Sequence, residues 1–253
     1  MLSLQGEYKF TEEHKFRGRM NQHSRAEWVK WIGMKLTPLD WQRLEDSPFG
    51  PVLKMVRRVK CSAQLMHALL FNQVQTFKKS ETWYRVRGKY ARFSMKEFTL
   101  ITGLKCSPPN PADMVDDKKA VKDFFGGRHT VKVSELCTLF LMEQGESSYK
   151  MKLAHLMVVE GVILGTDKNR HVRPWVVKLL EDMDKFYDFP WGWVAYKETH
   201  KSLNRSMSRR LKTKRKDCTD RAAYGMCGIV LAFQVLPFFY VPIPLVFTLW
   251  LRY

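Results

Sequence analysis

Apolar residues recur at helical spacing along most of the chain, and this pattern predicts a mainly α-helical protein. The segments 61–77 and 153–164 are the clearest, because their apolar residues cover one side or most of a helix. Pro174 suits the first turn of a third helix, where the N–H that proline lacks has no partner. That helix carries an apolar stripe through Met183, and the proline and glycine of 189–192 end it.

A change of period interrupts the helices between residues 83 and 93. Aromatic and β-branched residues there flank a two-residue turn that contains Gly88, which predicts a short β-hairpin. Ser94 follows as a helix N-cap with Glu97 three residues later, and Gly103 ends that helix. The predicted fold is therefore mainly α, a single helical domain with a small β-hairpin near 83–93.

The distribution of charge divides the chain into three parts. Residues 1–44 are charged and weakly periodic, which predicts a weakly ordered lead-in that holds one or two short helices. Residues 45–244 carry the helical pattern and form the predicted domain. Residues 245–253 form an apolar tail after it.

The C-terminal part joins a dense basic run, 205–221, to a segment without any charged residue, 222–251. Length and composition allow a membrane span near 229–251, oriented by the basic flank. Three prolines interrupt this segment: Pro237, Pro242 and Pro244. Each proline removes a helical hydrogen bond that lipid does not replace. The prolines favour the alternative, a buried core helix followed by its exit.

Composition indicates a folded, strongly basic protein. The chain has 253 residues, 45% of them hydrophobic, with 8 Trp, 9 Tyr and 16 Phe, which argues against overall disorder. Its formal net charge of +18 favours polyanionic partners, such as nucleic acid bound without sequence specificity, or an anionic membrane surface. The 5 cysteines lack C-x-x-C spacing, and the first residues lack a signal peptide. We therefore expect free thiols and a location in the nucleus or cytoplasm.

The densest basic clusters lie within the run 205–221. Their composition is typical of a nuclear-import signal or of a patch that contacts phosphates. A solvated basic loop is the alternative interpretation. The candidate nucleic-acid or nuclear-import residues are Arg209, Arg210, Lys212, Lys214, Arg215 and Lys216.

The sequence offers no pattern typical of an enzyme. It contains no P-loop, dinucleotide-binding glycine motif, nucleophile elbow or zinc-ligand spacing, so we expect no cofactor, no metal and no catalytic residue. The acidic residues of 181–184 point to different sides of a helix, as solvated residues do. His155 and Glu160 lie roughly 140° apart around a helix axis, so their spacing does not make a catalytic pair.

Several short segments in a fixed order resemble a plant domain of unknown function, number 1985. That domain often precedes SUMO-protease-like domains in proteins related to Mutator-type transposable elements. The matching segments are 47–50, 64–71, 90–98, 102–106, 125–127, 160–167, 186–192 and 224–228. The resemblance runs from about residue 45 to about residue 244.

The resemblance implies a structural or interaction module, because the family has no catalytic residues to carry over. It also implies a protein partner such as a SUMO protease, whose domain this chain does not reach. Residues 236–244 lack the Trp and Glu that the family places before a final Ile-Pro. We therefore expect 245–253 to come from a truncated or altered gene copy.

Three functional hypotheses follow. The leading one is a non-enzymatic, transposon-derived plant module that acts in the nucleus through nucleic-acid or protein contacts. The alternatives are a tail-anchored membrane protein that spans near 229–251, and an accessory remnant of a SUMO-protease-type protein without its catalytic domain. The deciding observation is whether four side chains pack on the helices at 153 and 175: Leu231, Phe233, Val235 and Phe238.

Overall fold

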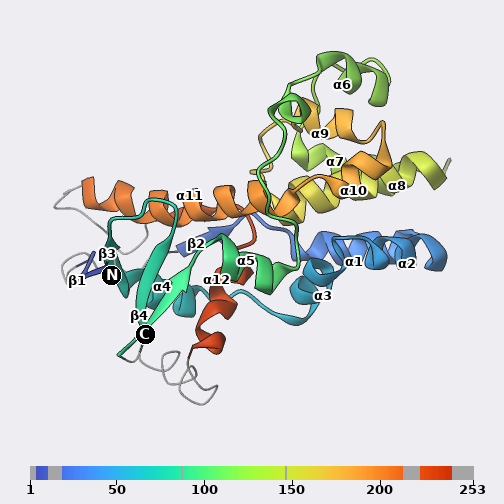
Figure 1. Cartoon of the computed structure of the whole chain (residues 1–253). Helices are drawn as coiled ribbons and strands as arrows, with labels where there is room; N and C mark the ends of the chain where they lie inside the picture. The colour runs from blue at the N-terminus through green and yellow to red at the C-terminus, as the bar shows by residue number, and fades with distance from the viewer. Residues whose placement is uncertain (1–3, 11–18, 87, 146, 213–222, 241–253) are drawn as a thin grey trace.

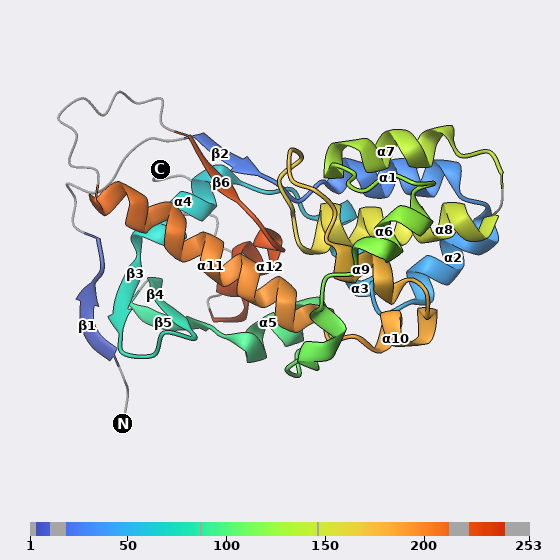
Figure 2. The same ribbon diagram turned by 90° about the horizontal axis from the view of Figure 1, so that it is seen from above.

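The computed structural model describes residues 4–10, 19–86, 88–145, 147–212 and 223–240. The described residues form a sheet-containing lobe and a helical lobe (Figure 1). The long helix α11 (Trp191–Lys212) begins beside the helical lobe and runs across the other one, as the view from above also shows (Figure 2). The fold class is mainly α with a few strands, which confirms the prediction.

The first lobe holds a four-stranded antiparallel sheet, in which the strand order is β1-β3-β4-β5. The predicted hairpin is confirmed as its second half, with Val86 paired to Lys89 at the turn. The strands are β1 (Leu4–Tyr8), β3 (Gln73–Thr76), β4 (Thr82–Val86) and β5 (Lys89–Phe93).

The helix predicted over 61–77 is shorter than expected. Helix α4 (Ala63–Phe71) ends at Phe71, and β3 follows after Asn72. The prediction was wrong for 73–77 because an apolar residue such as Val74 fits helical spacing and strand alternation equally well. Pairing with β1, more than 60 residues away in the chain, selects the strand.

The inner face of the sheet packs against a helix from the C-terminal segment. Tyr84 of β4 and Phe93 of β5 meet Phe233 of α12 (Val230–Val235), with ring centroids 4.8 and 5.3 Å apart. Buried Gln234 accepts from the backbone N–H of Ser62 at 2.7 Å and donates to the carbonyl of Lys60 at 2.8 Å. These contacts tie α12 to the sheet and to the start of α4.

The packing of the C-terminal segment differs in detail from the expectation. Leu231 and Phe233 are buried, but α12 packs on α4 and α5 (Met95–Thr102), and Phe238 is 40% exposed. The short 3-10 helix Leu236–Phe239 follows α12 directly. In the described part of the chain, no helix combines the length and the apolar character needed to cross a bilayer. The predicted span is thus not supported over 229–240, and 241–251 lie outside the described residues.

Helix α5 confirms the predicted cap. The Ser94 hydroxyl accepts from the Lys96 N–H, and the Glu97 carboxylate accepts from the Ser94 N–H at 2.9 Å, which forms a capping box. Gly103 ends the helix in the left-handed conformation, at φ 70°, which glycine adopts without strain.

The second lobe is built from short helices around a buried π-helix, Met157–Ile163. The predicted helix 153–164 is therefore the end of an α-helix followed by this π-helix. The α-helices of this second lobe are α1 (Ala26–Lys35), α2 (Pro38–Asp46), α3 (Gly50–Arg58), α6 (Lys118–Phe124), α7 (Val133–Met142), α8 (Ser147–Leu156), α9 (Pro174–Leu179) and α10 (Met183–Asp188). The stripe predicted through Met183 is split, because Asp182 caps α10 and starts a new helix.

Residues 26–46 are part of the core rather than a weakly ordered lead-in. Trp28, Val29 and Ile32 of α1 are buried, and α1 packs against the π-helix. The sequence pattern is weak here because α1 buries only one narrow side. The partner of that side lies about 130 residues further along the chain. The predicted tail 245–253 lies outside the described residues.

Candidate nucleic-acid interface

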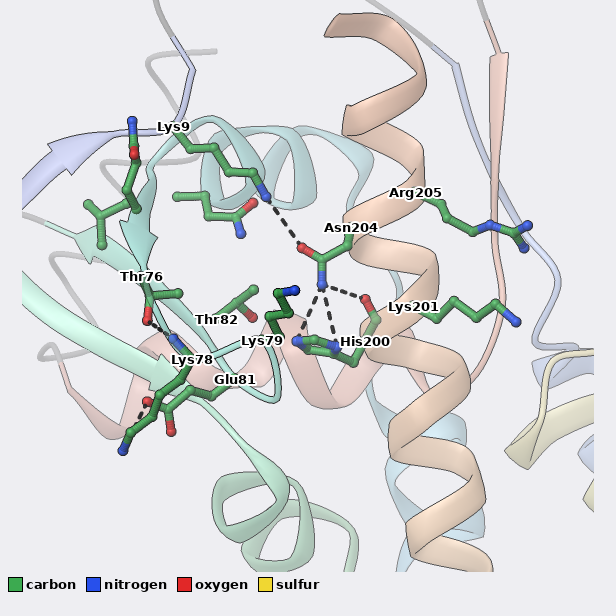
Figure 3. A pocket seen from close by; sticks show the side chains of 13 residues that line it. Lys9, Thr76, Lys78, Lys79, Glu81, Thr82, His200, Lys201, Asn204 and Arg205 are labelled. Carbon is green, nitrogen blue, oxygen red and sulfur yellow. Dashed lines mark hydrogen bonds and ion pairs between the residues drawn. The ribbon is translucent and has the colours of Figure 1, made fainter. Parts of the chain in front are cut away.

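A pocket of about 520 Å³ opens between the sheet and α11. Figure 3 shows Lys9 and Lys79 approaching from the sheet side, and His200 and Asn204 facing them from α11. Lys78 lies at the turn between β3 and β4, next to Lys79. Strand pairing forms one wall, since the Lys9 N–H donates to the carbonyl of Gln73 on β3 at 2.8 Å. We call this site the basic pocket.

Hydrogen bonds hold the polar side chains of the basic pocket together. The Lys9 ammonium donates to Asn204 Oδ1 at 3.5 Å, and Asn204 Nδ2 donates to the carbonyl of His200 at 3.0 Å (Figure 3). Burial lowers the pKa of Lys9. Burial also lowers the pKa of His200. The positive charges of Lys197 and Lys9 lower this pKa further, whereas a hydrogen bond with the backbone of Glu81 raises it. Burial thus disfavours the protonated forms of both groups.

Positive charge dominates the basic pocket. Its lining includes one carboxylate, Glu81, which pairs with Lys78 at 3.8 Å and accepts from Trp83 Nε1 at 2.9 Å. Within the ranges that the structure describes, the remaining cations form no ion pair. These cations are Lys9, Lys79, Lys201 and Arg205. The pocket therefore has the charge of an anion-binding site.

Figure 3 also shows that the basic side chains lie on both sides of α11. Lys201 and Arg205 extend away from the side of the helix that carries His200 and Asn204. Both are exposed and line the outer margin of the pocket. The positive surface thus continues from the pocket around the helix.

Part of the basic cluster predicted from the sequence lies on the same helix. Arg209, Arg210 and Lys212 belong to the last turns of α11, so the loop predicted over 205–221 is wrong as far as residue 212. Arg209 continues the four-residue spacing of Lys201 and Arg205 along the helix. The other predicted residues lie outside the described residues: Lys214, Arg215 and Lys216.

Sequence reasoning missed the sheet side of the pocket. Lys9 precedes Lys78 and Lys79 by about 70 residues, and pairing of β1 with β3 brings them together. The Lys78-Lys79 doublet was a weak signal, because such doublets are frequent in a chain with 43 basic residues.

The two segments 160–167 and 224–228 of the resemblance meet at the junction of the lobes. The Gly228 N–H donates to the carbonyl of Leu164 at 2.8 Å. The strand β6 (Ala223–Met226) pairs in parallel with β2 (Arg19–Gln22) just before this contact. The sequence favoured a buried core helix within 222–251, but the first described residues of that segment form this strand, and the helix begins at Val230.

Glu160 is the buried charge of this junction. Its carboxylate accepts from the Arg173 guanidinium at 2.5 Å, the Thr166 hydroxyl at 2.6 Å and the Arg173 backbone N–H at 2.9 Å. Arg173 also lies 3.8 Å from Glu198 of α11. Since both carboxylate oxygens of Glu160 accept hydrogen bonds from within the fold, the arrangement fixes the junction rather than presenting a reactive carboxylate.

His155 is a hydrogen-bonded core residue. Its ring nitrogens lie 2.7 Å from the carbonyl of Met151 and 2.7 Å from the Tyr187 hydroxyl. Burial lowers its pKa to about 4, against the opposing effect of the Met151 carbonyl, so the ring is neutral at neutral pH. It borders a second pocket of about 430 Å³, which Asp40 and Arg43 also line. His155 and Glu160 do not form a pair.

Cysteine and acidic residues give no metal site in the described residues. Cys61, Cys106, Cys137 and Cys227 are free thiols, and burial raises the pKa of each, to about 11 for Cys61. Asp182, of the acidic segment 181–184, serves as the N-cap of α10. No group of three or more His, Cys, Asp or Glu side chains with metal-binding geometry occurs among these residues.

Comparison with known proteins identifies a family but no individual relative. No curated protein and no solved structure matches the chain. A family model described as Domain of unknown function (DUF1985) matches residues 70–202, more than half of the chain. The matched region runs from the end of α4 to the middle of α11. It includes the hairpin, the capped helix α5 and the buried Glu160, and the chain therefore belongs to the DUF1985 family.

Proposed function

We propose that this protein is a non-enzymatic binding module that holds the phosphate backbone of nucleic acid at the basic pocket and along α11. The observation that carries the proposal is the charge of the pocket. Lys9, Lys79, Lys201 and Arg205 have no carboxylate partner among the described residues, and the single lining carboxylate is already paired. Phosphate oxygens would supply the missing counter-charge and offset the burial that lowers the Lys9 pKa.

Non-specific nucleic-acid binding fits this arrangement better than recognition of a small anion. The pocket is open along α11, and Lys201 and Arg205 continue the positive charge outside it (Figure 3). A backbone with regularly spaced phosphates can contact the pocket and the helix together. Such contacts release condensed counterions, so the affinity falls as salt is raised.

Neutralising the exposed part of this surface tests the proposal. We expect the triple variant Lys79→Gln, Lys201→Gln, Arg205→Gln to bind a labelled oligonucleotide roughly tenfold more weakly at low salt. The slope of log affinity against log salt should fall by about 2, because about three phosphate contacts are lost. Fluorescence anisotropy over a salt series measures both quantities.

A matched control removes the same charge from the other lobe. Lys118, Lys119 and Lys122 are exposed on α6, which lies far from α11's C-terminal half in both views (Figures 1 and 2). Changing these three lysines to glutamine should leave most of the affinity intact. Equal losses of affinity in the two triple variants would mean that binding depends only on the net charge of the protein, which would contradict the proposed site.

We further propose the nucleus as the compartment, because Arg209–Lys216 has the composition of an import signal. A tandem fluorescent fusion, too large to diffuse passively through nuclear pores, should accumulate in the nucleus. Accumulation should disappear when Arg209, Arg210, Lys212, Lys214, Arg215 and Lys216 are changed to glutamine. Nuclear accumulation of that variant would remove the basis of this proposal.

The link to a SUMO-type protease, the plant source and the derivation from a transposable element stay predictions of the resemblance. An accessory role beside such a protease would require the two chains to interact. Co-purification of the tagged chain with a SUMO protease tests that role, and its repeated absence would contradict it.

A further inference from the structure

The outer face of the four-stranded sheet carries an unusual row of residues. Residues paired directly across antiparallel strands share a face of the sheet. Tyr8 pairs with Val74, Val74 with Trp83, and Trp83 with Arg92. The row therefore places a tyrosine on β1, a tryptophan on β4 and an arginine on β5, all facing away from α12.

A second row adds another aromatic and another cation. Arg85 on β4 pairs with Tyr90 on β5, two residues from the first row on each strand. The Tyr90 hydroxyl lies 3.9 Å from the position that a side-chain carbon at Gly6 would take. Gly6 has φ +73° at the register shift of β1, so it both bends the strand and leaves room for the phenol. The Tyr90 ring thus extends over the outer face towards β1.

A hydrogen bond and a cation–π contact hold Trp83 of the first row in place. Trp83 Nε1 donates to Glu81 at 2.9 Å, and the Arg92 guanidinium lies 5.8 Å from its ring centroid. Arg92 is fixed in turn by two hydrogen bonds to Glu97, at 2.7 and 3.1 Å. The Arg85 side chain is exposed, and its guanidinium forms no ion pair with the described residues.

Exposure separates this face from the inner one. Tyr84 and Phe93 on the inner face are 1% and 0% exposed, whereas Tyr8 and Tyr90, on the two edge strands of the outer face, are 45% and 38% exposed; Val74, between Tyr8 and Trp83 in the first row, is buried. The solvent face of an antiparallel sheet is normally polar, whereas this face exposes a tyrosine on each edge strand beside its buried centre. Phe77, 68% exposed directly after β3, adds an aromatic between this face and Lys78.

We infer that the outer face of the sheet is a stacking platform for the unpaired bases of a single-stranded nucleic acid. The inference rests on the proposed function and specifies the class of its ligand. Aromatic rings bind bases of any identity by stacking, and a four-stranded sheet accommodates two or three bases. Arg85 is placed to meet a phosphate beside the stacked bases.

The platform and the basic pocket are connected through β1. Successive residues of a strand point to opposite sides, so Tyr8 faces the platform and Lys9 faces the pocket. A strand whose bases stack on the platform can pass over the edge of β1 and place its backbone in the pocket. A duplex has no free base faces to offer, so it uses the pocket alone.

The experiment separates stacking from charge. The probes are end-labelled oligodeoxythymidylate and oligouridylate of about 16 nucleotides and a duplex of the same length. We expect both single strands to bind more tightly than the duplex. The double variant Tyr8→Leu, Tyr90→Leu should bind single strands at least about tenfold more weakly, with an unchanged salt slope. The double variant Tyr8→Phe, Tyr90→Phe keeps both rings and should bind like the wild-type protein.

Each contrary outcome has a defined meaning. Wild-type affinity of the leucine variant, or a duplex bound as tightly as the single strands, overturns the platform. In that case the proposed function is still tested separately, by the affinity and salt slope of the triple variant Lys79→Gln, Lys201→Gln, Arg205→Gln. A chain that binds none of the three probes overturns both. Circular dichroism shows whether the leucine variant folds. If it does not fold, the single variant Tyr90→Leu is measured instead, and we again expect weaker binding of single strands.

Discussion

Replacing Arg173 with methionine is expected to lower the free energy of unfolding by about 3 kcal/mol. The change removes the guanidinium that pairs with Glu160, whose side chain is 0% exposed. Methionine keeps most of the length and the apolar stem but leaves a buried carboxylate with only the Thr166 hydroxyl and one backbone N–H. Urea denaturation followed by circular dichroism measures the change.

An exposed ion pair supplies the control. Lys178 of α9 lies 3.5 Å from Asp117, and both side chains are substantially exposed. Lys178→Met should cost less than about 1 kcal/mol, because solvent screens such pairs. A loss for Arg173→Met no larger than this would mean that the buried network does not hold the lobes together.

Replacing Gly228 with alanine is expected to destabilise the protein by roughly 2–4 kcal/mol. Gly228 has φ +78°, a left-handed conformation that costs alanine strain. The added carbon would also lie 2.7 Å from the backbone nitrogen of Thr199 on α11 and would overlap its hydroxyl. Since Thr199 is buried, the helix itself would have to move. Thermal and urea unfolding both report the loss.

Gly126 isolates the contribution of the backbone conformation. It has φ +60° but no atom within 4 Å of the added carbon. Gly126→Ala should therefore cost only about 1 kcal/mol. The difference between the two variants measures how closely the turn after β6 approaches α11, and similar losses would show that this approach is not tight.

Both predictions concern the junction where distant parts of the chain meet. Glu160 and Gly161 lie on the π-helix, and a side-chain carbon at Gly161 would overlap the buried Trp28 ring. Gly165 comes close to Gly228 and to Ser24 in the same way. Gly161 and Gly165 thus allow close packing between distant segments of the chain.

Local signals in the sequence succeeded where the deciding interactions are local. The hairpin at 83–93 and the cap at Ser94 were predictable, because a glycine turn and a capping box act within about four residues. The start of α9 at Pro174 follows from the same kind of signal. The charge of the chain predicts a polyanionic partner, and the structure gathers some of its basic residues at the pocket beside α11.

The tertiary structure decided what depends on distant segments. Val74 is in a strand, not a helix, because β1 pairs with β3, and the same pairing brings Lys9 to Lys78. The platform has no local signal at all, since Tyr8, Trp83 and Tyr90 share a face only once the strand register is set. Register depends on complementary burial over the whole sheet, and no short window of sequence contains it.

The sequence by itself determined the helical class, the hairpin, the caps, the strong positive charge and the resemblance to a family. The tertiary structure alone decided that residues 26–46 join the core, that 205–212 extend a helix and that the uncharged C-terminal segment contributes a six-residue helix to a packed core. The physical reason is the range of the forces involved. Propensity and capping act within a helical turn, whereas burial and strand pairing choose among partners along the whole chain.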